Sequence, residues 1–190
     1  MTFPLTKQSD AEVVALTLSG RQEAYRELLA RYREPIYRLI RASTGDEHEA
    51  QDLAQETFIA AFSALGSYDP ARPLANWLRQ IALNKCRDWA RRRRLRAMLW
   101  RPAPIDTAHM VPDGAIPADV AAADRAELAR VNAAITRLPT RLRETLILRT
   151  IEGLTQTETA ELLGISKKAV ETRLYRARGK LTAMLADRPP

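Results

Sequence analysis

The chain of 190 residues carries 30 Lys and Arg against 23 Asp and Glu, a net charge of +7. This length allows one or two domains, and the basic balance favours a polyanionic partner. The single cysteine, Cys86, excludes an internal disulfide, and with His48 and His109 it forms no metal-ligand spacing. We expect neither a secretory signal nor a membrane-spanning segment, and therefore a cytoplasmic protein without membrane insertion, metal or cofactor.

The hydrophobic periodicity of the first half is helical, without convincing strand alternation, which predicts an all-α fold. Ser9 and Glu12 form a capping box at the start of a helix, and Gly45 ends a longer helix that contains Pro35, where we expect a kink. Successive helices are predicted over residues 10–18, 21–42 and 47–65, then after the loop 66–73 from Leu74 into a basic stretch.

The composition changes after this stretch. Residues 102–125 hold four of the eleven prolines and few large apolar side chains, which is typical of a flexible linker. Helical periodicity then resumes over about 125–136 and 140–151. The predicted organisation is two small helical domains at 1–98 and 124–187, joined by a linker at 99–123.

Residues 155–178 have the pattern of a helix-turn-helix. Thr155 and Glu158 form a capping box for the first helix, Gly164 allows the tight turn, and Ser166 can cap the second helix. The second helix is basic, as expected of a recognition helix in the DNA major groove. An ordinary helical hairpin with a solvated basic face is the alternative.

A second region combines aromatic and cationic side chains. All three tryptophans and Tyr68 fall within residues 68–100, and residues 84–101 carry a net charge of +7, equal to that of the whole chain. Stacking rings among cations suit single-stranded nucleic acid. The alternative is that the rings are core residues, which we favour for Trp77 and leave open for Trp89.

The helix predicted over 47–65 has an apolar face and, opposite it, an exposed face that includes Asp52, Gln55 and Glu56. This exposed face is either a docking surface for a basic helix or a solvated acidic surface. Both readings are compatible with the pattern.

Taken together, these segments resemble the extracytoplasmic-function group of bacterial RNA polymerase sigma factors. The resemblance covers nearly the whole chain and rests on the order and spacing of four blocks: DLAQETF at 52–58, WLRQIALNKCRDWARRRR at 77–94, LP at 138–139 and RLYRAR at 173–178. Members are transcription initiation subunits rather than enzymes, and they combine two helical domains.

The resemblance implies specific partners: core RNA polymerase, through its clamp coiled coil and flap, promoter DNA, and an anti-sigma factor. The expected polymerase-binding residues are Asp52, Gln55 and Glu56. The expected contacts to the melted −10 element are Tyr68, Asn76, Trp77, Asn84, Lys85, Trp89, Arg91 and Arg92, with Asn84 lining a pocket for a flipped base. The expected contacts to the −35 duplex are Lys167, Lys168, Glu171, Thr172, Arg173, Tyr175 and Arg176.

Glu171 departs from relatives that carry arginine there. Its carboxylate can accept a hydrogen bond from cytosine N4, so we expect it to influence the −35 sequence.

Two rival functions remain at this stage. A stand-alone helix-turn-helix transcriptional regulator explains the second domain but gives no role to the tryptophan-rich basic stretch or to DLAQETF. A membrane-surface or RNA-binding protein that uses residues 84–101 leaves the second domain unexplained. A closed and an extended arrangement of the two domains are equally compatible with the sequence.

Overall fold

In a computed structural model, the chain is described over residues 5–99 and 120–186, and these residues form helices without any strand. The all-α prediction is therefore confirmed. The α-helices are α1 (Asp10–Leu18), α2 (Gln22–Thr44), α3 (Glu47–Ser63), α4 (Leu74–Leu99), α5 (Val120–Arg137), α6 (Thr140–Thr150), α7 (Gln156–Leu163) and α8 (Lys167–Ala186). Two short 3-10 turns, η1 (Leu5–Lys7) and η2 (Leu65–Ser67), complete the described elements.

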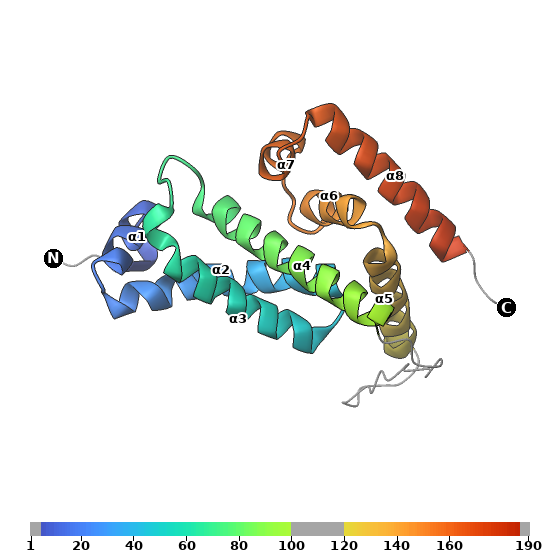
Figure 1. The fold of residues 1–190 in the computed structure, drawn as a ribbon, viewed down its shortest axis with the longest axis horizontal. Coiled ribbons are helices and arrows are strands. Elements are labelled where there is room, and N and C mark those ends of the chain that lie inside the picture. Colours follow the sequence, from blue (N-terminus) through green and yellow to red (C-terminus); the bar gives the residue numbers. More distant parts are fainter. Residues whose placement is uncertain (1–4, 100–119, 187–190) are drawn as a thin grey trace.

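The first four α-helices pack around one another. Helices α2, α3 and α4 lie side by side, and α1 covers one end of α2 (Figure 1). Their contact is apolar because each helix turns one stripe inward; Ile36, Leu39 and Ile40 of α2 and Leu83 of α4 are fully buried. This packing presents one face of α3 and one face of α4 to the outside.

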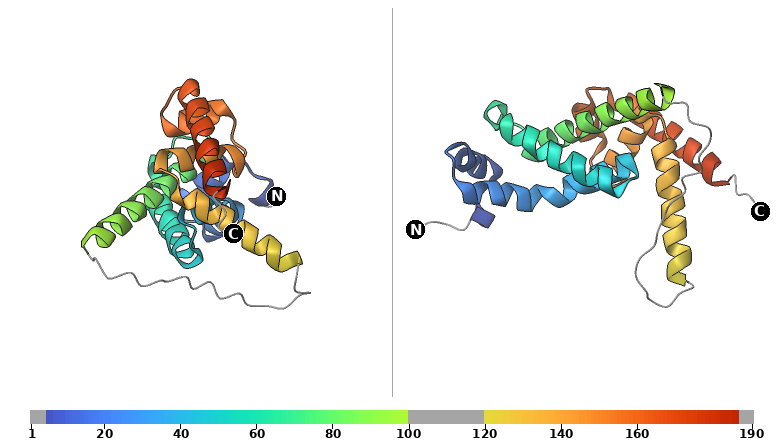
Figure 2. Two further views of the ribbon diagram at one scale, coloured as in Figure 1. Left: turned by 90° about the vertical axis from the view of Figure 1, so that its right-hand side faces the viewer. Right: turned by 60° about the horizontal axis from the view of Figure 1, so that its bottom comes forward.

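The second group of helices centres on α6, which packs against α2 and α8. Its middle is buried through Ile147 and Leu148, and α8 contributes Ala177 to the same cluster. Helix α5 projects from this group as a long arm (Figure 2). The buried apolar side chains form one cluster that runs from Val13 in α1 to Ala177 in α8, so the two groups share a core in this structure.

Local sequence signals set the helix ends as predicted. The Ser9–Glu12 capping box is present, and so is that of Thr155 and Glu158, whose backbone and hydroxyl bonds are both 2.7 Å long. These hydrogen bonds from Thr155 lower the pKa of Glu158 below its ordinary value. Gly164 ends α7 in the left-handed conformation with φ 63°, which fixes the turn into α8.

Several predicted boundaries change. Helix α3 ends at Ser63 rather than at 65, and the expected loop after it begins with the η2 turn. Helix α5 begins at Val120, inside the predicted linker of 99–123, and residues 100–119 of that linker lie outside the described residues.

Gly45, between α2 and α3, lies close to α5 of the second group of helices. It ends α2 with φ 75°, and a Cβ placed on it would lie 2.5 Å from Cγ2 of Thr136 in α5. Gly45→Ala should lower the free energy of unfolding by more than the about 1–2 kcal/mol that left-handed backbone costs an alanine, because the new methyl group also collides with Thr136. Urea unfolding followed by circular dichroism measures the change.

Gly20→Ala is the matched control, because Gly20 has φ 85° with nothing within 4 Å of its Cβ position. Equal losses of stability in the two variants would show that α5 does not press on Gly45 in solution.

Candidate nucleic-acid interface

A short motif, Asn-x-x-Arg, occurs twice along α4, at residues 76–79 and 84–87. In each copy the arginine Nη1 donates to the asparagine Oδ1, at 3.1 Å from Arg79 to Asn76 and at 3.0 Å from Arg87 to Asn84. Both asparagines expected to contact the −10 element are therefore held by an arginine one helical turn further on.

The same two arginines bind carboxylates from the second group of helices. Arg87 donates two hydrogen bonds to Glu144 of α6, from Nε to Oε1 at 2.6 Å and from Nη2 to Oε2 at 2.9 Å. Arg79 Nε donates to Oε2 of Glu152, just after α6, at 3.0 Å. The side chains of Glu144 and Glu152 are only 7% and 1% exposed, so both acids depend on these arginines for charge compensation. Because its bonds with Glu144 stabilise the charged form, the pKa of Arg87 is raised.

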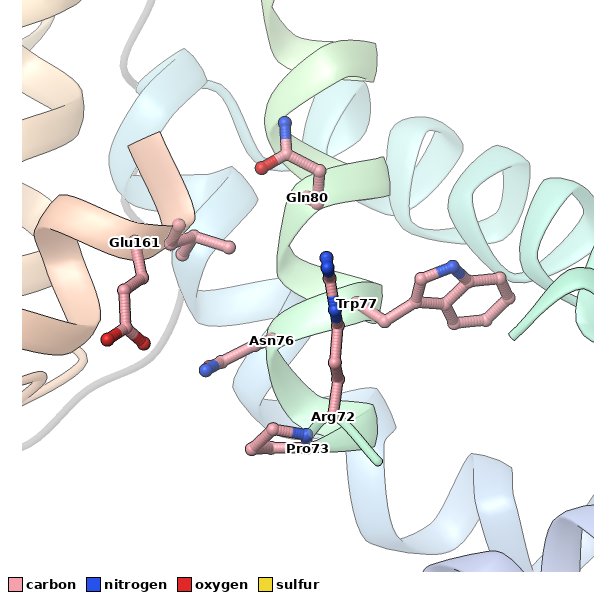
Figure 3. A pocket seen from close by; sticks show the side chains of 7 residues that line it. Arg72, Pro73, Asn76, Trp77, Gln80 and Glu161 are labelled. Carbon is pink, nitrogen blue, oxygen red and sulfur yellow. The ribbon is translucent and has the colours of Figure 1, made fainter. Parts of the chain in front are cut away.

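Helix α7 faces the beginning of α4 across a hollow of about 500 Å³, lined by residues from both helix groups. Figure 3 shows Asn76 and Gln80 of α4 on one side and Glu161 of α7 on the other, while the ring of Trp77 extends to the far side of α4. The hollow therefore lies over the first predicted base-reading asparagine, in the closed arrangement of the two groups.

The aromatic residues are distributed differently from the prediction. Trp89 is buried, with its indole Nε1 donating to Glu49 at 2.7 Å, and Tyr68 is buried with its hydroxyl on the Arg72 carbonyl. Trp77, for which we favoured a core position, is half-buried; it packs against the core cluster and on Tyr68 at a centroid distance of 5.5 Å. Neither Trp89 nor Tyr68 offers an exposed ring face to a base in this structure, and their contact with the −10 strand stays a prediction.

The end of α4 is an exposed basic helix. Arg91 and Arg92 are both exposed, and Arg91 forms an ion pair of 2.8 Å with Asp88 on the same helix. Lys85 lies closer to the bundle and pairs with Glu56 of α3 at 3.2 Å. A residue predicted for DNA and one predicted for polymerase thus contact each other.

The predicted docking residues of α3 lie beside two hollows. Gln55 faces one of about 1280 Å³ between α2 and α3, which also exposes Ile59 at 60% of its surface. Asp52 and Glu56 face another, of about 540 Å³, between α3 and α4. The three residues share a helix but not a single groove.

Helix α8 presents its predicted −35 residues together. Lys167, Lys168, Glu171, Tyr175 and Arg176 are exposed. The other two predicted residues, Thr172 and Arg173, are half-buried, and the Thr172 hydroxyl donates to the Lys168 carbonyl at 2.9 Å.

The orientation of α8 is fixed by its first turn. Ser166 accepts a hydrogen bond from the Ala169 amide at 3.1 Å, as its predicted capping role requires. Gln156 of α7 donates to the Lys167 carbonyl at 2.8 Å and ties the two helices of the motif together. Lys168 and Glu171 form an exposed ion pair of 3.2 Å on the outer face.

Buried ionisable groups lie where the two helix groups meet. Burial raises the pKa of the Cys86 thiol to about 12, so this cysteine is not a reactive thiolate at neutral pH. Arg143 is buried in α6, which lowers its pKa, and it donates to the Thr136 carbonyl at 2.7 Å. Within residues 5–99 and 120–186, no cluster of three or more His, Cys, Asp or Glu side chains could hold a metal, and none of the helices is long and apolar enough to cross a membrane.

Sequence reasoning missed Arg79, Glu144 and Glu152 as members of this interface. The repeated Asn-x-x-Arg motif was the available signal for the arginine. Nothing local marked the two glutamates, whose partners lie 57 and 73 residues away along the chain.

Comparison with known proteins matches both halves of the chain to one family. The family described as Sigma-70 region 2 matches residues 28–96, and that described as Sigma-70, region 4 matches residues 128–181. The RNA polymerase sigma factor CnrH of Cupriavidus metallidurans is 38% identical over 182 residues, which cover 94% of this chain and 95% of CnrH. The ECF RNA polymerase sigma factor SigW of Bacillus subtilis is 32% identical over 174 residues, covering 88% of this chain and 92% of SigW.

A solved structure of CnrH in complex with the cytosolic domain of CnrY matches with a TM-score of 0.70 and 37% identity, covering 95% of this chain and 100% of that one. The chain belongs to the extracytoplasmic-function RNA polymerase sigma factors, the alternative initiation subunits that bind core RNA polymerase and direct it to specific promoters.

Proposed function

We propose that this sigma factor divides its work among three helices: α3 docks on the polymerase clamp coiled coil, α4 reads the melted −10 strand, and α8 reads the −35 duplex. The observation that carries this assignment is the geometry of α8. Its capped first turn and the α7 contact hold five exposed polar and aromatic side chains on one basic helix, as major-groove reading requires. Binding and positioning of DNA suffice for this role, which requires no catalytic residue.

Run-off transcription tests the assignment directly. Purified protein is added to bacterial core polymerase with a library of genomic promoters at moderate salt. Transcripts that depend on the protein and share −35 and −10 elements support the proposal. If no transcripts appear and the protein fails to co-purify with core polymerase, a stand-alone helix-turn-helix regulator becomes the better account.

We expect a protein partner in addition to polymerase and DNA. CnrH, at 37% identity, was solved with the cytosolic domain of CnrY. By analogy, we propose that an anti-sigma factor with a cytosolic segment binds this chain, and that the chain works in the cytoplasm, where core polymerase and promoters are found.

Docking on polymerase should depend on Ile59. This apolar side chain is 60% exposed beside Gln55 at the hollow between α2 and α3, where a partner helix would cover it. Ile59→Ala should weaken binding to core polymerase about tenfold, equivalent to about 1.4 kcal/mol, in a fluorescence titration. Ser63→Ala, one turn later on α3 and outside the hollow, should bind normally; equal loss in both variants would place the docking surface elsewhere.

Reading of the −10 strand should depend on Asn84. Its exposed amide can hydrogen-bond a flipped base, a contact comparable to base-edge pairs that contribute about 1–3 kcal/mol. Asn84→Ala should therefore reduce open-complex formation, measured by permanganate reactivity of the melted strand, while binding to core polymerase stays unchanged. An equal loss of both activities would contradict a base-reading role.

Recognition of the −35 element should depend on Glu171. Glu171→Arg removes the acceptor for cytosine N4 and supplies a donor suited to guanine, so the preferred sequence should shift by about 1–3 kcal/mol of discrimination at one base pair. Selection from a randomised −35 library in the presence of core polymerase measures the preferred sequence. Glu161→Arg, the same change on exposed α7, is the control; an unchanged preference in the Glu171 variant would remove it from the base-reading set.

A further inference from the structure

Arg79 and Arg87, which donate hydrogen bonds to the two asparagines proposed for the −10 element, also bind the second group of helices. In each copy of the motif a chain of contacts runs from asparagine to arginine to glutamate: Asn76–Arg79–Glu152 and Asn84–Arg87–Glu144. We call the four charged residues Arg79, Arg87, Glu144 and Glu152 the α4–α6 latch.

We infer that Arg79 and Arg87 are phosphate-binding residues for the melted promoter strand, and that Glu144 and Glu152 occupy them in the free chain. This inference rests on the proposed −10 role of α4. It adds two DNA contacts, and it makes the two glutamates competitors of the DNA phosphates for the same arginines. The latch then makes closure of the free protein and binding of the strand mutually exclusive.

The chemistry of the guanidinium group supports the exchange. Arginine presents a planar fork of donors that fits a carboxylate and a phosphate in the same bidentate manner. The two hydrogen bonds from Arg87 to Glu144 already use this fork, so a phosphate can bind there only after Glu144 leaves. Each arginine also lies three residues after an asparagine proposed to read a base, where the backbone of the same strand has to pass.

The charges around Glu144 indicate what holds the latch together. Arg87 and Arg94 of α4, Arg141 of α6 and Arg173 of α8 line a hollow of about 470 Å³, and among the described residues that line it Glu144 is the only acid. Like charges from both helix groups therefore gather around one carboxylate. Neutralising Glu144 leaves these arginines to repel one another across the interface, which favours separation.

The other half of the latch is incompletely satisfied. Glu152 is 1% exposed, and its Oε1 is buried without a hydrogen-bond partner, while only Oε2 contacts Arg79. A buried carboxylate oxygen without a partner is unfavourable compared with the same oxygen in water. The Arg79–Glu152 pair consequently stabilises the closed form less than a fully hydrogen-bonded pair would, so the closed form can open.

Two paired variants test the inference in the full-length protein. Glu144→Gln with Glu152→Gln removes the competing charges and keeps the arginines. Arg79→Ala with Arg87→Ala breaks the same latch but also removes the proposed phosphate contacts. Glu23→Gln with Glu127→Gln is the charge-matched control, because both acids are exposed and form ion pairs within their own helix group.

Two readouts are applied to each protein. The first is the distance between fluorophores on Ser63→Cys in α3 and Thr182→Cys in α8, both exposed positions; the native Cys86 is buried and stays unlabelled. The second is anisotropy of a fluorescent random-sequence single-stranded DNA. Apparent affinity falls with the fraction of closed protein, so opening should strengthen binding while the arginines remain.

The inference predicts that both latch variants lengthen the distance, that the glutamine pair binds the strand about tenfold more tightly, and that the alanine pair shows no such gain. The control pair should change neither readout. An unchanged distance in the glutamine pair would overturn the masking role, and equally tight binding by the alanine pair would overturn the phosphate contacts. The distance readout involves no polymerase, so its failure is distinguishable from failure of run-off transcription.

Discussion

The contact between α4 and α6 is the constraint on which the rest of this structure depends. Arg87 and Glu144 form a two-bond ion pair in which the acid is almost fully buried, and Arg79 and Glu152 form a second pair. Because breaking a buried pair strands a charge, these contacts fix how the second group of helices sits on the first. The apolar cluster that runs through both groups adds non-directional attraction to this fixed register.

In this arrangement the three proposed binding surfaces differ in how accessible they are to a partner. The α3 hollow and the outer face of α8 are open, whereas the beginning of α4 faces α7 across a hollow. On the proposed assignment, polymerase docking and −35 reading need no rearrangement, whereas −10 reading needs the α4–α6 latch to open. A partner with higher affinity for the separated form shifts the equilibrium toward it, and we propose that core polymerase is such a partner.

Local features of the fold were predictable and long-range ones were not. The capping boxes at Ser9 and Thr155 and the left-handed glycines at Gly45 and Gly164 were read from the sequence because their partners lie within a few residues. Five of the seven candidate residues on α8 are exposed and two are half-buried. The sequence left Trp89 open between core and surface, because a helical period does not tell which neighbour covers an aromatic ring, and the structure places it in the core. The glutamates of the latch left no local signal, since their partners are on another part of the chain.

The most direct test of this account is the distance between α3 and α8 in the doubly labelled protein, measured before and after addition of core polymerase. The account predicts one short distance in the free chain and a longer one in a complex that supports transcription. An unchanged short distance in a transcribing complex would contradict it, because the −10 strand would then be read while the α4–α6 latch is still closed.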